Sequence, residues 1–134
     1  MQKLITIFLG LVIMAVQGFA QTIPSDLVTA MSKGDVNVAA DYFHQNLEMT
    51  ILEKDYMVSK TQATRILKDF FKENPPSGFK ISFEGSKEKS KYAIGTLSTS
   101  KGDFRVNLFF MNKQETRLIY YLSIVKESRY ELSP

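Results

Sequence analysis

The chain has 134 residues with 17 Lys and Arg, 14 Asp and Glu, one His and no Cys, and its formal net charge is +3. The absence of Cys excludes disulfides, and with the single His44 it argues against a structural zinc site. Basic and acidic residues are interspersed, so the sequence lacks the basic stripe with interleaved aromatic residues that favours nucleic-acid binding. We therefore expect no metal, no cofactor and no nucleic-acid partner.

Residues 1–20, MQKLITIFLGLVIMAVQGFA, have the three-part pattern of a secretory signal peptide. Lys3 is followed by an uncharged run from Leu4 to Val16 and by small residues before the expected cleavage point. This run is shorter than the roughly 20 apolar residues that cross a bilayer, which favours cleavage over anchoring. We expect an exported protein, periplasmic or extracellular, with residues 21–134 as one domain and no membrane contact after signal removal.

Two short helices are expected next. The segment QTIPSDLVTAMSKGD predicts the first, with Ser25 as its N-terminal cap and Gly34 as a left-handed C-terminal residue. Asp35 is expected to cap the second, VNVAADYFHQN. Its predicted buried side consists of Val38, Ala39, Tyr42 and Phe43.

The segment LEMTILEKDYMVS predicts two short strands, or a strand and an extended arm, around a turn. Ser59 then opens the clearest helix of the chain, KTQATRILKDFFKEN, which Pro75 and Pro76 end. The apolar stripe of this helix consists of Ala63, Ile66, Leu67, Phe70 and Phe71.

The chain after Gly78 is strand-like. In FKISFEG, Phe79, Ile81 and Phe83 are expected on one side of a strand because they alternate with polar residues. In the last strand, alternation places Leu118, Tyr120, Leu122 and Ile124 on one side and Ile119, Tyr121, Ser123 and Val125 on the other. Three helices followed by a run of antiparallel strands indicate an α+β domain with helices on one face of a sheet.

The segment KYAIGTLSTSKGDFRVNLFFMN predicts a hairpin with Lys101 and Gly102 as its turn. This register pairs Thr99 with Phe104, Leu97 with Val106, Gly95 with Leu108, and Ala93 with Phe110, and we assign this face to the core. The opposite face carries Tyr92, Ile94, Thr96 and Ser98 against Met111, Phe109, Asn107 and Arg105.

The second face is too apolar at one end to remain in water, because an exposed apolar patch favours association. We expect a homodimer partner, packed sheet to sheet, to cover it, and a bound small amphipathic molecule is the second choice.

The sequence also resembles a known family. A helix ending in SKGD, a second helix running into YF, a strand containing LEMTI, a helix ending in FFKENPP and the stretch KYAIGTLSTSKGDFRV together look like a small secreted bacterial family of unknown function. That family belongs to the nuclear transport factor 2-like superfamily, which is cystatin-like. The resemblance implies a cone or roll, in which three N-terminal helices pack on a strongly curved antiparallel sheet of four to six strands, often with a pocket and a dimer.

No catalytic residue can be assigned by this resemblance, because the motifs of the enzymes in the superfamily do not map onto the chain. Asp41 and His44 are three residues apart on an expected helix, where the carboxylate could orient the imidazole as a general base. An ordinary helix end is the better interpretation of these two residues. The candidate ligand-binding residues are Tyr92, Thr96, Arg105, Asn107 and Tyr120. The simpler interpretation is that these residues lie at the hydrated rim of a dimer interface.

The sequence thus favours a non-catalytic, dimeric module that binds a small molecule or interacts with the cell envelope. The alternative is an enzyme of the isomerase or hydrolase type that uses a polar group in the cone pocket.

Overall fold

The computed structural model describes residues 23–113 and 116–127, which form three helices and six strands. The expected signal peptide lies outside the described residues. The helices are α2 (Ser25–Lys33), α3 (Val36–Ala40) and α4 (Lys60–Glu73). The strands are β1 (Phe43–Ile51), β2 (Lys54–Ser59), β3 (Pro76–Lys87), β4 (Ser90–Thr99), β5 (Gly102–Lys113) and β6 (Thr116–Lys126).

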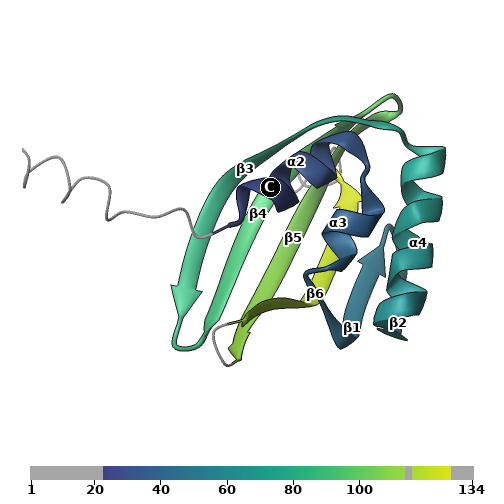
Figure 1. Ribbon diagram of the computed structural model, residues 1–134. Coiled ribbons are helices and arrows are strands. Elements are labelled where there is room, and N and C mark those ends of the chain that lie inside the picture. The colour runs from purple at the N-terminus through teal and green to yellow at the C-terminus, as the bar shows by residue number, and fades with distance from the viewer. Residues whose placement is uncertain (1–22, 114–115, 128–134) are drawn as a thin grey trace, which may run out of the picture.

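The strands form one curved sheet in the order β2-β1-β6-β5-β4-β3, with helices on one face (Figure 1). This arrangement confirms the predicted α+β class. Two details differ from the prediction. The strands β1 and β6 run parallel, so the sheet is mixed. The three helices are not all N-terminal, because α4 follows the β1–β2 hairpin, in the place where its segment was predicted. A parallel pair is compatible with the chain because several elements separate β1 from β6.

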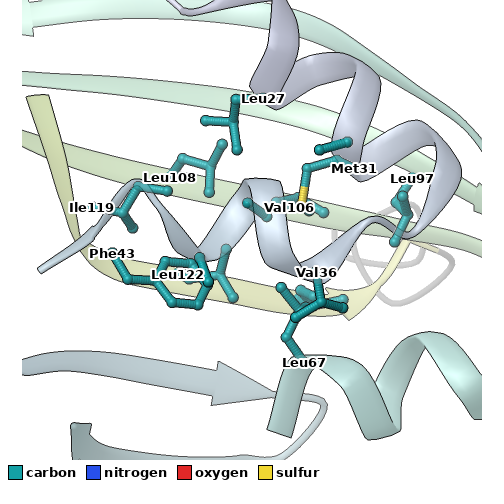
Figure 2. Close-up of a cluster of buried hydrophobic side chains, with 14 of the residues drawn as sticks. Leu27, Met31, Val36, Phe43, Leu67, Leu97, Val106, Leu108, Ile119 and Leu122 are labelled. Atoms are coloured by element: carbon teal, nitrogen blue, oxygen red, sulfur yellow. The ribbon is translucent and has the colours of Figure 1, made fainter. Parts of the chain in front are cut away.

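The core lies between the helices and the inner face of the sheet. In Figure 2, Leu27 and Met31 of α2 point toward the sheet, where Leu108 and Val106 of β5 lie. The helix α2 packs mainly over β3, α3 lies between α2 and α4, and α4 packs against β1 and β2. Every element except β2 contributes a fully or nearly fully buried apolar side chain.

The first two helices follow the prediction only in part. Gly34 has the expected left-handed conformation with φ 76°, and the Asp35 side chain accepts a hydrogen bond from the Val38 amide. Ser25 is not the cap, because it is the first helical residue and Pro24 occupies the cap position without a side-chain hydrogen bond. The second helix is also shorter than predicted: it ends at Ala40, and Phe43 already belongs to β1.

The helix α4 agrees with the prediction. Ser59 and Gln62 form a reciprocal capping box, in which the Ser59 Oγ accepts from the Gln62 amide at 3.2 Å. The predicted apolar stripe faces the core, with Ile66 partly buried and the other members buried. The ring of Phe70 meets Phe104 of β5 edge to face at 5.1 Å.

The central hairpin has the predicted faces but a different register. Thr99 pairs with Gly102, and Leu97 pairs with Phe104, so Ser100 and Lys101 form the turn. The Thr99 Oγ1 donates to the Gly102 carbonyl at 2.7 Å and closes this turn. Because the shift is two residues, every side chain stays on its predicted face.

Two β-bulges overturn the alternation predicted for β3 and β6. A register shift between Ile81 and Phe83 places Phe83 opposite Ile94, and Phe83 is 52% exposed instead of buried beside Phe79. A bulge inserts one extra residue into its strand, so simple alternation assigns the wrong face to the residues beyond it.

In β6, Phe109 pairs with Tyr121 and Phe110 pairs with Ile119, which leaves Tyr120 as the extra residue. Ile119 is therefore buried on the core face together with Leu122 and Ile124, whereas alternation predicted it on the opposite face. The prediction that Tyr120 shares a face with Leu122 was wrong for the same reason.

Candidate functional site

An open pocket of about 970 Å³ lies between the C-terminal half of α4, the β1–β2 turn and the end of β6. Its walls combine apolar, aromatic, charged and amide side chains. They are Ile51, Leu52, Glu53, Lys54, Tyr56, Ile66, Asp69, Phe70, Glu73, Asn74, Val125 and Lys126. A concave site with an apolar surface and a few polar groups is the usual form of a small-molecule site.

The backbone of the β1–β2 turn is fixed against β6. The Leu52 amide donates to the Ile124 carbonyl at 2.7 Å, and Ile51 is aligned with Ile124 in the parallel ladder. Leu52 has a φ of 59°, which is uncommon for a side chain of this size. The parallel pairing therefore positions the turn as one wall of the pocket, facing α4.

Asn74 forms the opposite corner of the pocket. It is 9% exposed, its amide N–H donates to the Phe70 carbonyl at 2.8 Å, and its Nδ2 donates to the same carbonyl at 3.0 Å. Within the described residues its Oδ1 accepts no hydrogen bond. Sequence reasoning missed Asn74, although an Asn between the end of a helix and a Pro-Pro pair was the available signal.

The outer face of the sheet carries a row of aromatic side chains, which we call the aromatic row: Phe83, Tyr92, Phe109, Tyr120 and Tyr121. Neighbouring rings lie 5.7 Å (Phe83–Tyr92), 5.9 Å (Tyr92–Phe109) and 5.3 Å (Phe109–Tyr121) apart. The ring of Tyr92 lies over Gly85, where a Cβ would come within 2.3 Å of the ring. The two bulges complete this row, because they bring Phe83 and Tyr120 to the outer face.

The five residues predicted to bind a ligand all lie on this outer face. Thr96 pairs with Arg105, and Asn107 lies between Ile94 and Ser123. All five predicted residues are half-buried. Tyr92 and Tyr120 both contact the ring of Phe109, from opposite sides of the row. None of the five lines the pocket. Their ligand-binding role stays a prediction.

Asp41 and His44, the two residues considered as a general base, do not share a helix face. Asp41 is the C-terminal cap of α3, whereas His44 belongs to β1. The His44 Nδ1 lies 2.9 Å from the Asn46 carbonyl oxygen, so its contact is local backbone. The interpretation as a general base fails because the second helix ends earlier than the sequence predicted.

A hydrogen bond at the surface connects α2 to Tyr42, the residue before β1. The Tyr42 hydroxyl donates to Asp26 Oδ1 at 2.5 Å. Burial, this hydrogen bond and the negative charges of Asp26 and Asp41 raise the pKa of Tyr42 to about 12. A phenol has a pKa near 10 when unfolded, so the folded state holds this proton more tightly.

We predict that this bond stabilises the fold fully below pH 10 and that its contribution is lost as pH rises through about 12. The Tyr42→Phe variant should therefore lose less stability than the parent protein between these two pH values, as measured by urea unfolding. Asp26→Asn should act in the same direction, and the double variant should add little to either. Parallel stability curves for parent and Tyr42→Phe protein would contradict the assignment.

Two further observations bear on the kind of site. Among the described residues there is no group of three or more His, Cys, Asp or Glu side chains placed to hold a metal ion. The described helices are all too short or too polar to span a bilayer.

A curved sheet covered on one face by three helices, with an open pocket at one end, defines a small two-layer α+β protein. The chain belongs to the DUF4783 family, a domain of unknown function whose family model matches residues 24–125. No curated protein matches the sequence.

Solved structures agree with this assignment. A DUF4783 family protein from Bacteroides ovatus is 33% identical with a TM-score of 0.76, over 80% of this chain and 97% of that chain. A DUF4783 family protein from Bacteroides fragilis is 35% identical with a TM-score of 0.74, over 78% and 98% of the two chains. An NTF2-like protein from Cytophaga hutchinsonii is 13% identical with a TM-score of 0.56, over 75% and 88%, and it shows similarity of fold alone.

Proposed function

We propose that this protein is a non-catalytic module that binds a small amphipathic molecule in the pocket between α4 and the β1–β2 turn. The observation that carries the proposal is the pocket itself, with its volume of about 970 Å³ and its mixed lining. Ile51, Ile66, Phe70 and Val125 supply an apolar surface, while Asn74 and the charged residues supply polar groups at the same site. An amphipathic molecule matches both kinds of surface.

Filling the pocket should abolish binding. We expect the neutral fluorescent probe N-phenyl-1-naphthylamine to bind saturably to the parent protein and to lose at least about tenfold in affinity in Ile66→Trp, because the larger ring occupies the pocket. Fluorescence titration measures the affinity of the parent protein and of the variant for the probe.

The matched control is Ile94→Trp, which adds the same ring to the outer face of β4. It should leave probe binding unchanged, and circular dichroism should show that both variants fold. The opposite pattern, with loss only in Ile94→Trp, would move the site to the outer face and to the residues that the sequence singled out there.

The proposal includes export and self-association. The N-terminal pattern of residues 1–20 supports export to the periplasm or beyond. The aromatic row and Met111 support a homodimer packed through the outer face, because Phe83, Phe109 and Met111 are 52%, 36% and 40% exposed. Phe83 lies on β3 and the other two on β5, with Tyr92 of β4 between them. A partner sheet would bury this surface.

Sedimentation equilibrium tests the dimer. We expect the parent protein to dimerise at micromolar concentration and Phe109→Lys to remain monomeric, because a charge in the middle of an apolar interface is desolvated without a partner. Thr61→Lys is the control, since Thr61 is exposed on α4, away from the outer face of the sheet. A parent protein that is monomeric at high micromolar concentration would refute the dimer and would leave the pocket proposal intact.

An enzyme of the isomerase or hydrolase type is the second candidate. The observation in its favour is that the carboxylates of Glu53, Asp69 and Glu73 line the same pocket as Tyr56. These groups could exchange protons with a bound molecule. The pocket is open to solvent, whereas such chemistry gains from the exclusion of water, and for this reason we place binding first.

A further inference from the structure

We infer that the ligand of this pocket is an organic cation with an apolar body, such as an alkylamine or a quaternary ammonium compound. The inference rests on the proposed function, since it names the ligand class of the same pocket. It is carried by the polar groups that the end of α4 presents there.

Two carboxylates of α4 lie one turn apart. Asp69 and Glu73 are four residues apart, so their side chains lie on the same face of the helix, and both line the pocket. Like charges at this spacing repel each other. A bound cation between them relieves the repulsion and gains attraction to both.

Asn74 adds a third acceptor at the pocket wall. Its Oδ1 accepts no hydrogen bond within the described residues, although the side chain is only 9% exposed and its Nδ2 is held by the Phe70 carbonyl. This oxygen has no donor within the described residues, so a ligand that brings an N–H or a positive charge can interact with it in place of water.

The backbone of α4 acts in the same direction. Asn74 caps the C-terminus of this helix, where unpaired carbonyl groups give a partial negative charge. This charge attracts cations within the last turn, and Asp69, Glu73 and Asn74 all lie in or beside that turn. The helix end and the side chains are thus independent sources of negative potential at one place.

The remaining wall suits the apolar part of such a molecule. Tyr56 and Phe70 supply aromatic rings, whose faces attract cations, and Ile51, Ile66 and Val125 supply an aliphatic surface. Two lysines, Lys54 and Lys126, also line the pocket, and they are exposed, as Asp69 and Glu73 are. Long side chains of this kind can cover apolar surface with their methylene groups while the ammonium group stays in water.

Isothermal titration calorimetry with three probes of equal chain length tests the inference. Octyltrimethylammonium, 1-octanol and octyl sulfate share their apolar part and differ in charge. We expect the cation to bind at least about tenfold more tightly than octanol, and the sulfate to bind most weakly. Added salt should weaken binding of the cation and leave that of octanol nearly unchanged.

The double substitution Asp69→Asn with Glu73→Gln should reduce the affinity for the cation by about tenfold or more and leave that for octanol unchanged, because it removes charge and keeps shape. The control is Glu84→Gln with Asp103→Asn, which removes two exposed carboxylates of β3 and β5 and should change neither affinity.

Equal binding of the cation and octanol, or no effect of the α4 substitutions, would overturn the cation inference while the pocket proposal stands. If Ca²⁺ displaces the ammonium probe and binds more tightly than the probe does, this result would also overturn the cation inference, in favour of a metal-ion site. Failure of all three probes to bind would overturn both the inference and the proposed function.

Discussion

The Phe110→Ala variant is expected to lose about 3–5 kcal/mol of its free energy of unfolding. Phe110 is 1% exposed and is the largest of the fully buried side chains in the described part of the chain. Its removal forfeits apolar burial and leaves a cavity that the rigid strands β4, β5 and β6 cannot close. For a small domain, this loss is a large part of the total stability.

The neighbouring residue provides a matched control. Phe109 has the same side chain but lies on the outer face and is 36% exposed, so Phe109→Ala should lose only about 1 kcal/mol. Chemical denaturation at low protein concentration measures both values without a contribution from association. Equal losses for the two variants would contradict the assignment of the two faces of β5.

The Gly95→Ala variant is expected to lose about 1–3 kcal/mol. A Cβ at this position would come within 2.8 Å of the Lys80 carbonyl oxygen and 2.9 Å of the Phe79 ring. The carbonyl belongs to the backbone of the paired strand β3, so it cannot move without disturbing the ladder. Gly95 is therefore required by the close approach of Phe79 to β4.

Gly85→Ala is the contrasting substitution. Its Cβ would lie even closer to a neighbour, at 2.3 Å, but that neighbour is the far end of the Tyr92 ring. This ring can rotate toward solvent, so we expect a loss below about 1 kcal/mol. Thermal unfolding of both variants, with parent protein alongside, would refute the distinction if Gly85→Ala proved the more damaging.

Several local features were predictable because they depend on nearby residues alone. The capping box of Ser59 and Gln62, the left-handed Gly34 and the stop at Pro75 all follow from short-range backbone chemistry. The two faces of the central hairpin were also predicted, since the alternation of apolar residues persists when the register changes by two.

The positions of the bulges were not predictable from the alternation. Phe83 and Tyr120 continue the alternating pattern of their strands, yet each lies on the face opposite to the predicted one. A bulge depends on the curvature that the whole sheet adopts around its helices, and no local pattern in the sequence encodes it. The aromatic row exists because two such bulges occur.

The pocket was equally inaccessible to sequence reasoning. The residues singled out on the hairpin lie on the outer face, whereas the pocket is formed by α4, the β1–β2 turn and β6. Its formation depends on the parallel pairing of β1 with β6, which joins segments far apart in the chain.

The sequence by itself determined the α+β class, the helix α4 with its N-terminal cap and the core face of the hairpin, because apolar periodicity and capping act over a few residues. Only the tertiary structure decided where Phe83, Tyr120 and Asn74 lie, because sheet curvature, bulges and the β1–β6 pairing depend on contacts between distant segments.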